Sequence, residues 1–112
     1  MKVIKALEAP EFDNPHKVSA RLVHSTEYID MVLMTLQPGE TLKLHTTPVD
    51  ACFYGIEGQG VVVADDESAP IGANDLVHSP KGQPHLLRNE GTAVFRFLVI
   101  KTPRPMMAAK GA

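Results

Sequence analysis

Glycine and proline interrupt this sequence at short intervals, which limits the chain to short structural elements. Eight glycines and nine prolines occur among its 112 residues, and they recur about every eight to twelve positions, the spacing expected of short strands. The segments between them are rich in Val, Ile, Leu, Phe and Thr, and no helical repeat is sustained along them. The pattern is typical of an all-β sandwich or barrel.

The strands are predicted where these β-forming residues gather between turn signals. Pro38-Gly39 and Lys81-Gly82 are examples of the turns, since Gly tolerates a positive φ and Pro presets the first turn position. The predicted strands are residues 3–7, 18–24, 28–36, 41–45, 51–56, 60–64, 75–79, 85–89 and 93–100.

The length and composition favour one soluble domain. A chain of 112 residues fits a single core, so we expect a barrel domain over residues 1–102 and a loosely docked tail over 103–112. Charges run through the N-terminal region and the apolar runs are short, so neither a signal peptide nor a membrane span is expected. A single cysteine, Cys52, suits a reducing compartment, and we expect a cytoplasmic protein.

The charge pattern bears on partners. The net charge is −2 and the basic residues are scattered, which argues against nucleic acid or an anionic membrane as a partner.

The segment 51–56 is apolar on both faces, with Ala51 and Phe53 on one face and Cys52, Tyr54 and Ile56 on the other. Because no helices are expected to cover a sheet, the N-terminal strands or a second subunit must cover the second face. We therefore expect a homodimer.

Two segments in the middle of the chain carry spaced motifs. Residues 39–58 read GETLKLHTTPVDACFYGIEG, and residues 74–89 read NDLVHSPKGQPHLLRN. Their spacing resembles the two motifs of the cupin superfamily, G-x5-H-x-H-x3-4-E-x6-G and G-x5-P-x-G-x2-H-x3-N. Asn74 replaces the first Gly of the second motif, a mild exchange because Asn also adopts left-handed turns. The resemblance implies a jelly-roll barrel, or double-stranded β-helix, of two antiparallel sheets with a pocket at its mouth.

The resemblance also implies a metal site, although an incomplete one. In cupins, two His and a Glu of the first motif and the His of the second coordinate a divalent metal, commonly Fe, Mn, Ni or Zn. The matching positions here are His45, Thr47, Ala51 and His85. Only His45 and His85 retain strong ligand atoms, whereas protein sites for these metals usually hold three or more. A divalent metal held by His45 and His85 is therefore one hypothesis, and tight binding by the standard site is not expected.

Other residues are candidates to replace the missing ligands. Asp50 adjoins the vacant Glu position, and His78 precedes the turn of the second motif, so either side chain is a candidate if it points inward. Cys52 should point away from the site by strand alternation. His16 and His24 have no motif around them, and we expect them to be exposed or on an edge strand.

The predicted pocket suits a small organic ligand. Thr47, Phe53 and Leu87 share the predicted inner face with His45 and His85, which would give a mostly apolar pocket with a few polar groups. One hypothesis is an enzyme of dioxygenase, isomerase or lyase type, in which the two histidines hold a metal or act as metal-free acid and base. The alternative is a non-catalytic module that binds or senses a small ligand without metal.

An arginine facing the pocket would select a ligand that carries a carboxylate, because guanidinium pairs with carboxylate in a bidentate manner. Arg88 and Arg96 are the arginines of the late predicted strands. The simpler interpretation of both is a solvated or interface position.

Overall fold

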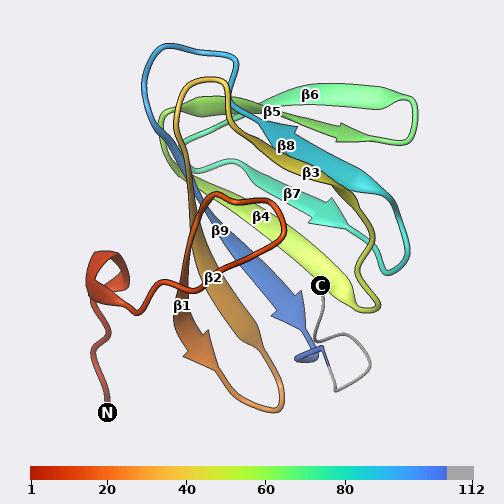
Figure 1. Cartoon of the computed structure of the whole chain (residues 1–112). Helices are drawn as coiled ribbons and strands as arrows, with labels where there is room; N and C mark the ends of the chain where they lie inside the picture. Colours follow the sequence, from red (N-terminus) through yellow and green to blue (C-terminus); the bar gives the residue numbers. More distant parts are fainter. Residues whose placement is uncertain (106–112) are drawn as a thin grey trace.

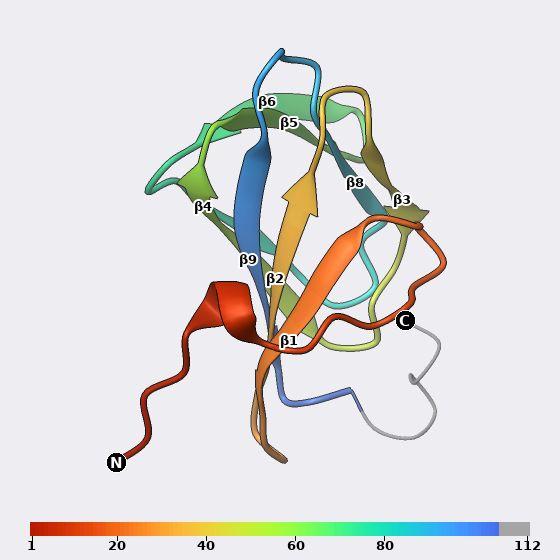
Figure 2. The same cartoon turned by 60° about the vertical axis from the view of Figure 1, so that its left-hand side comes forward.

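The computed structural model describes residues 1–105 as two antiparallel β-sheets packed face to face (Figures 1 and 2). The larger sheet has the strand order β1-β2-β9-β4-β7 and the smaller one the order β3-β8-β5-β6. The sheets are built from strands distant in sequence, so that β9 lies between β2 and β4 in the larger sheet. The predicted all-β architecture of two antiparallel sheets is confirmed.

The observed elements follow the predicted ones closely, with two exceptions. The structure contains η1 (Ala6–Glu8), β1 (Ser19–Ser25), β2 (Asp30–Leu36), β3 (Thr41–His45), β4 (Asp50–Glu57), β5 (Gln59–Ala64), β6 (Glu67–Gly72), β7 (Leu76–Ser79), β8 (His85–Arg88) and β9 (Phe95–Thr102). The predicted strand over residues 3–7 is wrong, because the 3-10 turn η1 occupies part of this segment.

The second exception is β6, a strand that the sequence pattern does not predict. Its residues include Glu67, Ser68 and Pro70, which are poor strand formers. Among the described strands, β6 lies at the edge of the smaller sheet and pairs with β5 alone, and an edge strand tolerates a proline. Its pairing with a neighbour therefore outweighs its weak local preference.

The core lies between the two sheets and is formed by alternate residues of the strands. Ala51 and Phe53 of β4 are 0% and 1% exposed, which confirms the inner face predicted for this segment. On β9 the buried series is Phe95, Phe97 and Val99, and the next position in this alternation is Lys101. The inner face of β9 thus begins in the core and ends in a charged side chain.

The turns of the two motifs have the predicted backbone chemistry. Gly39, Gly82 and Asn74 all adopt a positive φ, and that of Asn74 is 70°. Asn89 is 2% exposed and closes the turn after β8. Its side-chain amide donates to the carbonyls of Leu36 and Ala93, and its Oδ1 accepts the N–H of Gly91. These residues shape the barrel and orient the strands that carry the histidines.

The outer face of the larger sheet carries exposed apolar side chains, including Tyr54 and Leu76 on neighbouring strands. The homodimer that this face suggested stays a prediction. The predicted tail, residues 103–112, is described only as far as Pro105, and the rest of it lies outside the described residues. Within residues 1–105, no helix is long and apolar enough to cross a membrane.

Candidate functional site

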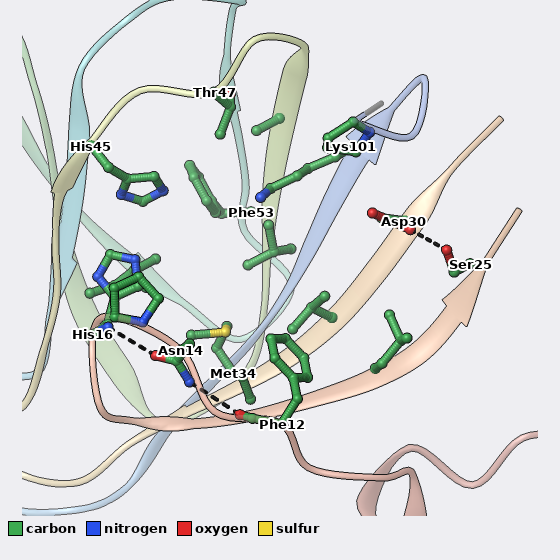
Figure 3. Close-up of a pocket in the computed structure, with 18 of the residues that line it drawn as sticks. Phe12, Asn14, His16, Ser25, Asp30, Met34, His45, Thr47, Phe53 and Lys101 are labelled. Carbon is green, nitrogen blue, oxygen red and sulfur yellow. Dashed lines mark hydrogen bonds between the residues drawn. The ribbon is translucent and has the colours of Figure 1, made fainter. Parts of the chain in front are cut away.

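A cavity of about 410 Å³ opens at one end of the barrel, between the two sheets and the N-terminal segment (Figure 3). Its walls are mainly apolar and include Phe53, Met34 and Val99. The polar side chains that line it include His16, His45, His85, Thr47 and Lys101. Four of the five residues predicted to form the ligand pocket, His45, Thr47, Phe53 and His85, are therefore brought together at one cavity.

His45 and His85 face each other because their strands are neighbours. β3 pairs with β8, and the register places His45 opposite His85 after an irregularity that follows Leu42. The Nε2 atoms of the two rings lie 3.3 Å apart, and the rings meet edge to face with centroids 4.5 Å apart. The two motifs thus deliver their histidines to a direct contact.

The other nitrogen of each ring also has a partner. The Nδ1 atom of His45 lies 2.7 Å from the carbonyl oxygen of Lys43, so this nitrogen carries the hydrogen and donates it. The Nδ1 atom of His85 lies 2.8 Å from the hydroxyl of Ser79. The single hydroxyl hydrogen of Ser79 has two acceptors in reach, Gln83 Oε1 at 3.2 Å and His85 Nδ1. When Ser79 donates to His85, all ring nitrogens of the pair are satisfied, because His85 then donates to His45 and His45 donates to Lys43. The pair then forms a relay of hydrogen bonds that runs from Ser79 to the Lys43 carbonyl.

A third histidine, His16, packs against this pair, and the expectation that it would be exposed is not met. Its ring centroid lies 4.9 Å from that of His45. The backbone N–H of Lys43 donates to its Nδ1 at 2.9 Å, and its own backbone N–H donates to Asn14 Oδ1 at 3.1 Å. These contacts join segments distant in sequence, so no local pattern around His16 indicates them. His24 is exposed, as predicted.

Burial keeps the three imidazoles uncharged at neutral pH. Loss of hydration is the largest cause and lowers the pKa of His85 to about 4 and that of His16 to about 4, with a smaller contribution from the neighbouring His45. Burial also lowers the pKa of His45, although its bond to the Lys43 carbonyl acts in the opposite direction. A neutral imidazole has a lone pair that can accept a hydrogen bond or a proton, but a pKa of about 4 makes His16 and His85 weak bases at pH 7.

The two remaining positions of the first motif have no metal-binding side chains. Thr47 is 2% exposed, and its hydroxyl donates to the carbonyl of Val49 at 2.7 Å. Ala51 is fully buried, and its register partner on β9 is Lys101. Figure 3 shows the Lys101 side chain reaching into the cavity, with its nitrogen directed toward Phe53 and His45. An ammonium group therefore enters the site beside the position where the resemblance would place a glutamate.

This set of donors does not fit a tightly bound divalent metal. His16 cannot supply the missing ligand, because its Nδ1 accepts a hydrogen bond and its Nε2 must then carry the hydrogen of the neutral ring. The Lys101 ammonium adds an unfavourable charge for a cation. Across residues 1–105, no group of three or more His, Cys, Asp or Glu side chains has the arrangement of a metal site. Two imidazoles alone are fewer than such sites use.

The other candidates lie outside the cavity. Leu87 is fully buried in the core between the sheets rather than at the cavity surface. Asp50 is exposed and accepts the backbone N–H of Lys81, and His78 is also exposed, so neither completes the site. Arg88 and Arg96 form ion pairs with the exposed Glu90 and Glu57, which agrees with the simpler interpretation of both arginines.

Comparisons with known proteins agree with this architecture. The family model described as "Cupin domain" matches residues 32–101. The crystal structure of TT1209 from Thermus thermophilus is 30% identical, covers 94% of this chain and 100% of its own, and superposes with a TM-score of 0.81. A predicted oxalate decarboxylase from Thermotoga maritima is 23% identical, covers 91% of this chain and 99% of its own, and also has a TM-score of 0.81.

Among curated proteins, Auxin-binding protein 1 from Arabidopsis thaliana is 24% identical in an alignment 98 residues long, and the match covers 80% of this chain. The chain spans about half the length of this relative, since the match covers 50% of it. The shared part is therefore one barrel domain, and the activity of the whole relative does not follow from it.

Proposed function

Since the chain belongs to the cupin family, we propose that it binds a small organic molecule in the mouth of its barrel, against the His45–His85 pair. The observation that carries this proposal is the convergence of neutral imidazoles on one apolar cavity. The protein itself supplies hydrogen-bond partners for His45 and His85. What favours a ligand site over simple packing is that these polar rings line a concave, mostly apolar cavity, the usual form of a small-molecule site.

The dimensions and lining of the cavity support the proposal. Its volume of about 410 Å³ falls within the range of roughly 300–1,000 Å³ common for small-molecule sites. Phe53 and Met34 offer apolar surface to the hydrocarbon part of a ligand, while the histidines offer polar contacts on one side. This combination fixes both the size and the orientation of a ligand.

The chemistry that the residues support is metal-free proton transfer, as in an isomerase or lyase. A ligand with an acidic C–H or O–H near His45 would give its proton to Nε2 of His45 once this nitrogen is released from its hydrogen bond with His85, because Nδ1 already carries a hydrogen that is bonded to the Lys43 carbonyl. No protein-bound metal is needed for this step. The dioxygenase version of the enzyme hypothesis has less support, because the donor set does not hold a resident metal tightly.

A second candidate function is non-catalytic binding. The relay from Ser79 through His85 and His45 to the Lys43 carbonyl is already satisfied within the protein. A group with its hydrogen-bonding capacity satisfied in this way can be a fixed wall of a binding site as well as a base. The two candidates share the ligand site and differ in whether a proton leaves the ligand.

The ligand site is tested by screening small organic molecules for thermal stabilisation at pH 7.5, because a ligand that binds the folded state must raise its stability. The Ala51→Leu variant fills the cavity from its wall and should lose the stabilisation by every ligand found. His24→Gln, an exposed change outside the cavity, is the matched control. Ligands that stabilise Ala51→Leu as well as the unaltered protein would show that the cavity is not the site.

The same ligands separate the two candidates when they are incubated with the protein in deuterated water. Proton transfer should place deuterium on a carbon of the ligand, and His45→Asn should slow this exchange strongly while binding is retained. Binding with no exchange for any ligand would favour the non-catalytic module.

A further inference from the structure

Resting on the proposed function, we infer that the ligand is a small organic carboxylate and that Lys101 binds its anionic group. Neither motif includes Lys101, and a cupin metal is not part of the inference. In this chain the Lys101 ammonium would provide a positive charge beside Ala51, the position that matches the metal-binding glutamate of cupins.

Strand alternation fixes the direction of Lys101. It follows Phe95, Phe97 and Val99 at every second position of β9, and these three residues are 0%, 0% and 6% exposed. Continuing the alternation sends the Lys101 side chain inward, into the cavity that it lines. Its position is therefore set by the barrel and does not depend on a loop.

Within the part of the chain that the structure describes, the Lys101 ammonium is not paired with a carboxylate. Among residues 1–105, no Asp or Glu oxygen lies within 4.0 Å of its nitrogen, the limit for an ion pair. Asp30 is the register partner of Lys101 on β2, but its carboxylate accepts the hydroxyl of Ser25, and Figure 3 shows the Lys101 nitrogen directed away from it. A partly buried ammonium without a close counterion favours an anion from solution.

Two neighbouring groups agree with an anion in the cavity. Arg104 also lines it, so a second cation lies near the mouth. His16 must carry its hydrogen on Nε2, because its Nδ1 accepts from Lys43, and so it can only donate through its free ring nitrogen. Burial, the largest cause, lowers the pKa of Lys101, while the charge of Asp30, which also lines the cavity, acts in the opposite direction. A bound carboxylate would oppose the effect of burial further.

The rest of the cavity indicates the kind of anion. Phe53, Met34, Leu42 and Val99 form an apolar surface beside the ammonium. One principal cation with an apolar wall suits a single carboxylate on a hydrocarbon or aromatic body better than a multiply charged phosphate, which normally takes several cationic or N–H donors.

The experiment compares acids with their neutral amides, which have nearly the same shape. The probes are phenylacetate, benzoate and hexanoate and the three corresponding amides, and calorimetry measures their dissociation constants at pH 7.5. For the acids that bind, we expect at least about tenfold tighter binding than for the amide, the effect of one charge-assisted hydrogen bond. Lys101→Met should bring the ratio close to one and leave amide binding unchanged. Lys81→Met, at an exposed lysine outside the cavity, is the matched control and should keep the ratio.

The outcomes separate this inference from the proposed function. If acid and amide bind equally to the unaltered protein, the ligand site stands and the assignment of Lys101 is wrong. A preference for the acid that survives in Lys101→Met also overturns the assignment, because another cation must then carry it. If no acid and no amide binds in the millimolar range, the proposed function fails as well.

Discussion

Acid should destabilise this protein through its buried histidines, and His85 gives the largest expected effect. Its ring is 1% exposed, and burial lowers its pKa from 6.5 to about 4. Between these two values the unfolded chain binds a proton that the folded chain does not, so stability is complete above pH 6.5 and is lost as the pH falls toward 4. One pKa unit corresponds to about 1.4 kcal/mol, so the loss from this residue is about 3 kcal/mol across the window. His16 acts in the same direction with a smaller effect, because it is partly exposed.

The assay is urea unfolding at a series of pH values from 7.5 to 4.5, for the unaltered protein and for His85→Asn. Near pH 5 the free energy of unfolding should fall with decreasing pH more steeply in the unaltered protein than in His85→Asn. The expected difference between the two slopes is about 1.4 kcal/mol per pH unit. Asn is uncharged throughout and retains a polar group near Ser79, so the slopes are compared rather than the absolute stabilities. His24→Gln controls for the loss of an exposed histidine. Equal slopes in His85→Asn and the unaltered protein would refute the argument that burial holds His85 neutral.

Three further predictions concern the turn, the metal and the subunit contact. Asn89→Ala removes three hydrogen bonds of a buried side chain and should lower the free energy of unfolding by about 2–4 kcal/mol, measured by urea titration; a loss below about 1 kcal/mol would contradict the role given to this turn. Manganese, iron, nickel, zinc and copper should leave the melting temperature of the unaltered protein unchanged, whereas the triple variant Thr47→His, Ala51→Glu, Lys101→Met should be stabilised by at least one of them. No stabilisation of a correctly folded triple variant would mean that the first motif is aligned wrongly. The protein should sediment as a dimer of its 12.2 kDa chain, and Leu76→Asp on the exposed apolar face should shift it to monomer; a monomer at all concentrations would rule out the dimer.

The fold could be predicted because its local signals agree with one another. Turn residues mark the strand ends, and Asn74 adopts the positive φ that replaces a glycine of the second motif. The alternation of Ala51 and Phe53 correctly gave the inner face of β4. The errors lie at weak signals: residues 3–7 have a strand composition without a strand partner, and β6 has a partner despite a poor strand composition.

Residues of the site could be predicted from the sequence only where a motif or the alternation of side chains along a strand indicates their position. The motif spacing brought His45 and His85 together, but the position of Leu87 went wrong because an inward side chain can end in the core below the cavity. His16 was missed because its place depends on a contact with Lys43, 27 residues away in sequence. Lys101 did have a signal, since it continues the inward series of β9 by one more step.

The position of His16 has a consequence for where the functional unit begins. The family match covers residues 32–101, yet Phe12, Asn14 and His16 form one wall of the cavity and β1 forms the edge beside them. A fragment limited to residues 32–101 would keep most of the barrel but would lack the N-terminal wall of the cavity. Exchange of this N-terminal strip between related barrels would then alter which molecules are held, with the two motifs untouched. The cavity is thus lined both by residues inside the matched segment, such as His45 and Lys101, and by an N-terminal strip that lies outside it.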